Sequence, residues 1–386
     1  MTAIHAHSMI TSLGHDAATS CAAARAGLSR ACTIPEIEFT FDLTGEAEPV
    51  IAHAVPFLTR GFEGHARLQR LLFAGLSELK TQFNDDLLKT GPIGFYLSVP
   101  DPARTLRGHE LMTSDGARAD CVERANESGN EPSDTEFAQD LLAIAAAQAG
   151  WPGEIHIRYV SLAGHAGGLH CIALAKNELD AGHIATAIIG AADSLLDSET
   201  IAWLHSTNRL KLSGMPVGLM PGEACAFLLL SNNARENDAE IIGIGISAET
   251  KTLWSGATSV GEGLASALDQ VAERAQWEQD SPAWVICDQN GEVYRANEWG
   301  HVATRLRGAW PALESPIAWM PAASFGDTGS ASSLVAVCIA LQAFKRNYAP
   351  TDYAVVMSSS ESDSRAALVV NLKPRAAAFE KFGYGH

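Results

Sequence analysis

Two successive series of apolar strands and small-residue helices constrain the fold of this chain more than any other feature. In the first series, an apolar strand at 155–162 leads through the small-residue turn 163–168 into a buried helix at 169–179. In the second, the small-residue turn 322–330 leads into an apolar helix at 331–344. Strands that alternate with helices favour parallel sheets covered on both faces. The repetition predicts a duplicated α/β architecture.

The other expected elements follow from periodicity and from Gly, Pro and capping residues. Strands are expected at 4–10, 94–99, 186–189, 225–230, 241–246, 283–287 and 366–372, and helices at 17–26, 136–149, 261–276 and from about 296. Asp16 is positioned to cap the first of these helices. The two series divide the chain into halves at 1–236 and 237–386.

Composition excludes several classes of function. The formal charge of −18 would repel a nucleic-acid backbone and an anionic membrane surface. No apolar run approaches the ~20 residues that a membrane helix needs, and no secretory signal is visible at the N-terminus. Seven cysteines stand singly without CxxC spacing, which argues against a disulfide scaffold and predicts a reducing cytoplasm. The stretch from 104 to about 133 is polar and predicts a surface excursion.

One phrase formally fits a dinucleotide-binding fingerprint. Residues 243–248 read G-I-G-I-S-A, which matches G-x-G-x-x-A. The glycines alternate with Ile inside an expected strand, and no helix opens directly after them. We therefore interpret the phrase as part of a strand, and we expect no cofactor.

Five phrases follow one another in order across about 300 residues. They are Thr11-Ser12-Leu13-Gly14, the elbow His165-Ala166-Gly167-Gly168-Leu169-His170, Gly190-Ala191-Ala192-Asp193-Ser194, Pro221-Gly222-Glu223-Ala224-Cys225-Ala226 and Gly326-Asp327-Thr328-Gly329-Ser330-Ala331. Together these phrases resemble the β-ketoacyl synthases of the thiolase superfamily. The resemblance implies a thiolase fold, with five α-β-α-β-α layers, and a dimer formed by the strand just before the elbow.

The residues that such a synthase needs for condensation are replaced in this chain. His165 stands where the family carries its nucleophilic Cys, and an imidazole holds no stable acyl thioester. The first of the family's two catalytic His residues corresponds to Asp288 when residues are counted from the preceding strand, and to Cys287 when they are counted back from Glu298. The second corresponds to Asp327. The Lys and Asn that usually precede this second His correspond to Ala322 and Ser324, respectively.

The oxyanion loop is replaced as well. The family's glycine-rich G-F-G-G-T-N hairpin corresponds to Ser360-Glu361-Ser362-Asp363-Ser364-Arg365, and its two carboxylates would oppose a developing oxyanion. Four components of the condensing site are absent together, which favours a site that no longer condenses. Cys171 lies on the apolar face of the following helix, where a small buried core residue is the simplest interpretation.

Three interpretations of His165 remain open. It can be a polar plug that hydrogen-bonds Asp327 in an unused cavity. It can also belong to a rebuilt acyltransferase or hydrolase site, with Asp327 and either Cys287 or Asp288. His165 and two carboxylates could instead hold a divalent metal. We prefer the first interpretation and expect no metal.

The sequence therefore predicts a cytoplasmic pseudo-enzyme that binds other molecules. Its partner would be a thiolase-like chain, in a homodimer or a heterodimer such as chain-length-factor subunits form, or an acyl carrier protein. Residues 288–300 also resemble the corresponding stretch of thiolase-like accessory proteins of type VI secretion, so an adaptor for a secreted effector is the second possibility. Within this stretch we also expect an ion pair between Arg295 and Glu298. Tryptophans at 254, 277, 284, 299, 310 and 319 predict core packing or, where exposed, a partner-binding face.

Overall fold

The computed structural model describes residues 1–40, 47–89, 91–101, 104, 132–152, 155–275, 282–307 and 310–372. Most of the polar stretch expected to form a surface excursion, 104–133, lies outside these residues, and so does Trp277. None of the helices in this part of the chain combines the length and the apolar character needed to cross a membrane.

The described residues contain one sheet of ten strands, built from two sets of five. The first set runs in the order β1 (Ala3–Ile10), β7 (Glu223–Ser231), β6 (Thr186–Ser194), β4 (Ile93–Ser98) and β5 (Ile157–Ser161), and the second in the order β8 (Ala239–Ala248), β12 (Ser364–Leu372), β11 (Tyr353–Ser359), β9 (Trp284–Cys287) and β10 (Ile317–Trp319). When the five strands of each set are numbered in sequence order, their order across the sheet is the same in both sets: first, fifth, fourth, second, third. The identical order confirms the predicted duplicated architecture.

The sheet is mixed, whereas the sequence predicted parallel sheets. In each set the second, third and fourth strands are parallel, but the fifth, β7 or β12, is antiparallel to both of its neighbours. The reason is clearest for β12, because only four residues separate it from β11, and such a short connection joins antiparallel neighbours. The predicted phrase at 243–248 is part of strand β8, as expected.

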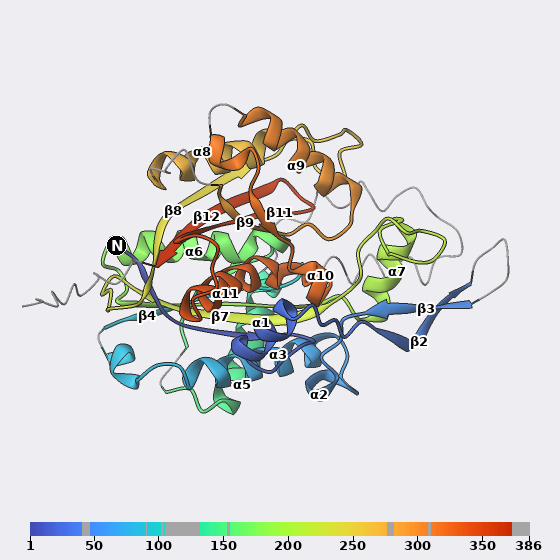
Figure 1. Ribbon diagram of the computed structural model, residues 1–386. Coiled ribbons are helices and arrows are strands. Elements are labelled where there is room, and N and C mark those ends of the chain that lie inside the picture. Colours follow the sequence, from blue (N-terminus) through green and yellow to red (C-terminus); the bar gives the residue numbers. More distant parts are fainter. Residues whose placement is uncertain are drawn as a thin grey trace, which may run out of the picture.

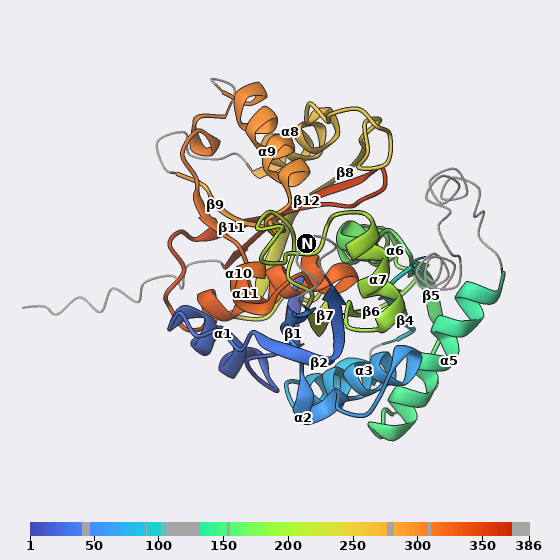
Figure 2. The same cartoon turned by 90° about the vertical axis from the view of Figure 1, so that its right-hand side faces the viewer.

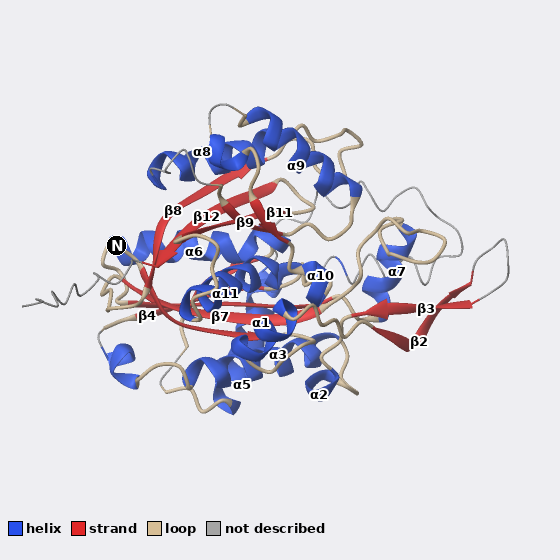
Figure 3. Ribbon diagram, viewed as in Figure 1, coloured by secondary structure: helices blue, strands red, loops and turns tan. Residues whose placement is uncertain are grey.

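The elements stack in five layers, as Figures 1 and 3 show. The helices are α1 (Ala17–Arg25), α2 (Pro56–Thr59), α3 (Gly64–Lys80), α5 (Pro132–Gln148), α6 (Gly167–Asp180), α7 (Ser198–Ser206), α8 (Glu262–Ala275), α9 (Val293–Arg305), α10 (Ala322–Phe325) and α11 (Ser332–Lys345). Helices α8 and α9 cover the second set of strands, α3 and α5 cover the first, and α6 and α11 lie between the two sets. A separate hairpin of β2 (Cys32–Thr40) and β3 (Ala47–Ala52) extends to one side.

Helix α11 is buried because it is apolar almost all round, whereas α6 buries one face and exposes Leu174, Asn177 and Asp180 on the other. Every residue of α11 from Ser333 to Phe344 is buried, and α6 contacts it along the middle layer. Gly168 allows this close approach, since a Cβ at that position would lie 2.7 Å from Leu334 Cγ. The predicted cap of α1 is also present, with Thr19 N donating to Asp16 Oδ1 at 2.6 Å.

The two halves are joined by hydrogen bonding as well as by sequence. Strand β1 pairs with β7 along its length and also with β8, through Ala3 opposite Glu240 and Ile4 opposite Ala239. Strand β7 ends at Ser231 and β8 begins at Ala239. We propose that the chain divides into its two halves, 1–236 and 237–386, within the connection between these strands.

The His7 imidazole on β1 provides a test of the central layer. Burial, with a smaller contribution from Lys345, lowers the pKa of His7 to about 4, although Gln342 Oε1 lies 3.3 Å from its Nε2. The pKa in the unfolded chain is about 6.5, so folding disfavours the protonated ring and stability falls as pH drops from 6.5 to 4. Between pH 6.5 and pH 4, the free energy of unfolding measured in urea is expected to fall by about 2–3 kcal/mol more for the wild-type protein than for His7→Gln. Parallel pH profiles for the two proteins would contradict a buried neutral His7.

Candidate functional site

The elbow between β5 and α6 presents His165 to the middle layer. Gly164 just before it has a φ of 61°, which turns the chain sharply after the strand, and α6 begins two residues after His165. His165 is 4% exposed. The elbow predicted at 163–168 is therefore present, with an imidazole at its tip.

Asp327 holds the imidazole in place. Asp327 Oδ1 lies 2.8 Å from His165 Nε2 and accepts the Gly329 N–H at 2.8 Å, and Asn290 Nδ2 donates to Oδ2 at 2.5 Å. The hydrogen bond predicted between His165 and Asp327 is thus observed. Burial alone would raise the pKa of Asp327, but its contact with His165, together with Arg295 and Asn290, lowers it well below its ordinary value. An ionised Asp327 can only accept, so Nε2 carries the hydrogen.

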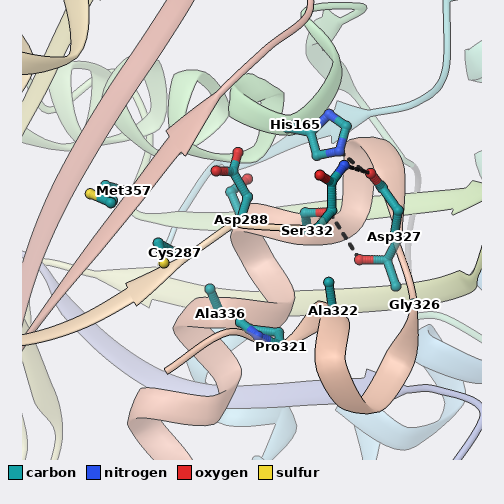
Figure 4. A pocket seen from close by; sticks show the side chains of 13 residues that line it. His165, Cys287, Asp288, Pro321, Ala322, Gly326, Asp327, Ser332, Ala336 and Met357 are labelled. Carbon is teal, nitrogen blue, oxygen red and sulfur yellow. Dashed lines mark hydrogen bonds and ion pairs between the residues drawn. The ribbon is translucent and has the colours of Figure 1, made fainter. Parts of the chain in front are cut away.

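Cys287 and Asp288 follow at the end of β9, and both line the same cavity as His165 and Asp327 (Figure 4). The Cys287 Sγ donates to the Trp319 carbonyl at 3.8 Å, and burial raises the pKa of this thiol to about 12. A thiol held protonated in this way is a weak nucleophile. The convergence of all four predicted residues is observed, while their catalytic roles remain a prediction.

The Asp288 carboxylate is engaged by other residues. Its Oδ2 accepts from Arg295 Nη1, from Ser358 Oγ and from Ser359 N, each at 2.8 Å. These contacts tie the end of β9 to the end of β11 and to α9. Asp288 therefore already has three partners and stabilises the local fold.

The cavity shared by these residues is nearly filled. Its volume is about 10 Å³, which is close to the ~10–15 Å³ that a single water needs. On this inner side of His165 there is no room for an acyl chain. The imidazole occupies the place where the resemblance would put a reactive thiol.

The hairpin between β11 and β12 lies against the elbow, as its alignment with the family's oxyanion loop implies. The Ser360 hydroxyl accepts the Ala166 N–H at 3.0 Å and donates to the Ala163 carbonyl. The sequence suggested two carboxylates opposing an oxyanion here. That expectation needs correction for Glu361, because its charge is paired with Arg209 at 2.7 Å.

The Arg295–Glu298 pair expected from their i,i+3 spacing is wrong. Arg295 bonds to Asp288, with Glu292 Oε2 3.7 Å from its Nε, while Glu298 Oε1 accepts from Arg365 Nε at 2.7 Å. Glu292, Arg295, Glu298 and Arg365 are buried, and tertiary partners decide the pairing of buried charges more than helical spacing does.

The metal interpretation lacks support in the described part of the chain, where no three His, Cys, Asp or Glu side chains gather in a way that could hold an ion. His165 has one carboxylate partner, Asp327, and the Asp288 carboxylate bonds to Arg295. Cys171 is fully buried on α6, and burial raises the pKa of its thiol. It is a core residue, as expected.

Comparison with solved structures identifies the fold. The ketosynthase/chain length factor of ishigamide is 17% identical with a TM-score of 0.64, and the match covers 96% of this chain and 99% of that one. The fold is that of the ketosynthases. A ketosynthase (ApeO) in complex with its chain length factor (ApeC), from Xenorhabdus doucetiae, is 14% identical with a TM-score of 0.68, covering 96% of this chain and 98% of that chain.

A third structure with the ketosynthase fold is AntDE:AntF, a type II polyketide synthase acyl-carrier protein in complex with its ketosynthase. It is 12% identical with a TM-score of 0.72, over 97% of this chain and 99% of that chain. No protein-family model matches the sequence, and no curated protein does. At this level of identity the comparison shows the fold, and the chemistry must be argued from the site.

Proposed function

We propose that this chain is a non-condensing scaffold with the ketosynthase fold, which acts by binding a protein partner. The observation that carries the proposal is the buried His165–Asp327 pair at the tip of the elbow, beside a cavity of about 10 Å³. A condensing enzyme needs a thiolate that accepts an acyl group at this position and room behind it for that group. Here the elbow carries an imidazole in place of a thiol, and the cavity behind it has no room for an acyl group.

A rebuilt acyltransferase or hydrolase site has less support. The Cys287 thiol is held protonated, and the Asp288 carboxylate bonds to Arg295. The His165–Asp327 pair alone is a base with its orienting carboxylate, without an activated nucleophile beside it.

The first candidate partner is another thiolase-like chain, in a heterodimer or a homodimer. Solved ketosynthases of the same fold are described in complex with a chain length factor. Strand β5 forms one edge of the sheet within the described residues and pairs there only with β4, so its outer edge can accept a strand from a second chain. An acyl carrier protein and a secreted effector are the alternative partners. The six cysteines of the described region are free thiols, which fits the proposed cytoplasmic location.

Acyl transfer can be tested directly. Incubation with an acyl-pantetheine thioester, followed by intact-mass measurement, is expected to leave the protein unmodified, because neither His165 nor the protonated Cys287 retains an acyl group. An active ketosynthase treated in parallel serves as the positive control. An adduct that disappears in His165→Ala or Cys287→Ala would overturn the proposal and favour the rebuilt enzyme.

Partner choice is tested by co-purification from the native cell. A thiolase-like chain that carries the Cys and two His of a working site supports the heterodimer. Recovery of a toxin-like effector in place of such a chain would favour the adaptor, and a monomer without any bound chain would contradict the scaffold.

A further inference from the structure

A second and much larger cavity lies on the outer side of His165. Its volume is about 410 Å³. The elbow residues 162–165, the hairpin residues 360–363 and the aromatic rings of Trp203 and Trp254 line it, together with Asp193. His165 therefore separates a nearly filled inner cavity from an open outer one.

The charges around the outer cavity are mostly negative. Asp101, Asp193, Glu361 and Asp363 line it, against the single guanidinium of Arg104 among the described lining residues. Arg104 forms two hydrogen bonds with Asp193, at 2.8 and 3.1 Å, and Glu361 is paired with Arg209.

The exposed Asp363 side chain, in contrast, makes no hydrogen bond or ion pair with any residue the structure describes. Its carboxylate interacts electrostatically with the His170 imidazole. The cavity thus retains negative charge that this part of the chain does not neutralise.

The second ring nitrogen of His165, Nδ1, adds a hydrogen-bond acceptor to this cavity. Its Nε2–H is bound by Asp327, and Figure 4 shows the other ring nitrogen turned away from Asp327. No residue of the described chain hydrogen-bonds to Nδ1. In the neutral ring Nδ1 has a lone pair and no hydrogen, so it accepts a hydrogen bond. The His165 side chain is only 6% exposed, and it offers an unused acceptor at a cavity that it lines.

The rings of Trp203 and Trp254 already contact one cation, the Arg209 guanidinium. The rings of Trp203 and Trp254 lie 5.6 Å apart, and the Arg209 guanidinium carbon is 5.2 Å and 5.7 Å from their centroids. Trp254 is only partly buried, so the pair also faces the cavity. Tryptophan faces attract ammonium and guanidinium groups.

We propose that this outer cavity binds the basic side chain, Lys or Arg, of a protein partner. The free carboxylate of Asp363, the acceptor nitrogen of His165 and the tryptophan wall all suit a group that carries positive charge and donates hydrogen bonds. The source is a protein because a chain with a net charge of −18 attracts basic macromolecular surfaces from a distance. This inference rests on the proposed function and extends it by naming the chemistry of the partner.

The test uses two small probes that differ by one charge. At low salt, Nα-acetyl-lysine methylamide is expected to bind the full chain at least about ten-fold more tightly than the uncharged norleucine analogue, by calorimetric titration. Binding should weaken as salt is raised, and the ¹⁵N resonance of His165 Nδ1 should shift on addition of the lysine probe. Equal binding of the two probes, or an unchanged His165 resonance, would overturn the proposal.

Variants locate the site. Asp363→Asn is expected to weaken binding of the lysine probe about five-fold, because it removes a carboxylate that carries no structural contact. Glu236→Gln, an exposed carboxylate on the loop between β7 and β8, is the matched control and should leave binding unchanged. Equal effects of the two variants would show a nonspecific charge effect and contradict the site.

The source of the basic group is tested with spermidine. Binding of spermidine about 100-fold tighter than that of a lysine-containing peptide would identify a small polyamine as the ligand and overturn the assignment to a protein. Because the probes bind the isolated chain, this experiment can fail while the acyl-labelling result still supports a non-condensing scaffold, and the reverse is equally possible.

Discussion

Replacing Arg295 with Met is expected to lower the free energy of unfolding by about 3–5 kcal/mol. The guanidinium is buried, donates to Asp288 Oδ2 at 2.8 Å and to the Ser359 carbonyl at 2.5 Å, and lies 3.7 Å from a carboxylate oxygen of Glu292. Methionine fills much of the same volume but leaves two carboxylates without this positive charge. Denaturant unfolding followed by circular dichroism measures the loss.

The matched control is Arg305→Met on the same helix. Arg305 pairs with Glu262 at 2.9 Å, but both side chains are about half exposed, so the loss should stay within about 1 kcal/mol. A second variant, Arg295→Met combined with Asp288→Asn, should recover part of the stability because it removes one of the stranded charges. A loss below about 1 kcal/mol for Arg295→Met would show that the buried carboxylates can find other partners.

Gly329→Ala is expected to destabilise the protein by about 3–5 kcal/mol, through two effects that add. Gly329 has a φ of 51°, and a Cβ there would lie 2.1 Å from Asp193 Oδ2. The Asp193 side chain cannot easily move, since Arg104 and the Ser330 N–H hold it. The Gly329 N–H also bonds Asp327, so the same change should disturb the His165–Asp327 pair.

Gly256→Ala separates the two effects. Gly256 has a similar φ of 68°, but no atom lies within 4 Å of the added Cβ. Gly256→Ala should therefore lower the free energy of unfolding by only about 1–2 kcal/mol, which is the cost of placing alanine in a left-handed backbone conformation. If the two glycine variants unfold at the same denaturant concentration, the close contact with Asp193 is not a structural constraint.

The sequence predicted the two central helices and most strands of the sheet because burial there imposes a strong periodic pattern. The elbow at 163–168 and the helices that became α6 and α11 needed small residues for close packing, and small residues are visible in a sequence. Strand β11 was missed, although its seven residues at 353–359 are almost all buried. A short apolar run of this kind resembles a helix segment or a loop when it is considered without its neighbours.

The candidate site was predicted in position and only partly in detail. His165, Asp327, Cys287 and Asp288 were placed together from the alignment of phrases, and the structure brings them around one cavity. The ion pairs were not predictable in the same way, since Arg365 and Glu298 are 67 residues apart. The outer cavity was also not predictable, because six separate segments of the chain contribute its walls.

The position of β1 between β7 and β8 affects the order in which the chain can fold. During synthesis, residues 3–10 leave the ribosome well before both of their pairing strands, at 223–231 and 239–248, which are made more than 200 residues later. Contacts at such long sequence separation slow folding. Strand β1 therefore stays unpaired until those strands are made, and until then both of its edges can pair with other nascent chains or bind chaperones.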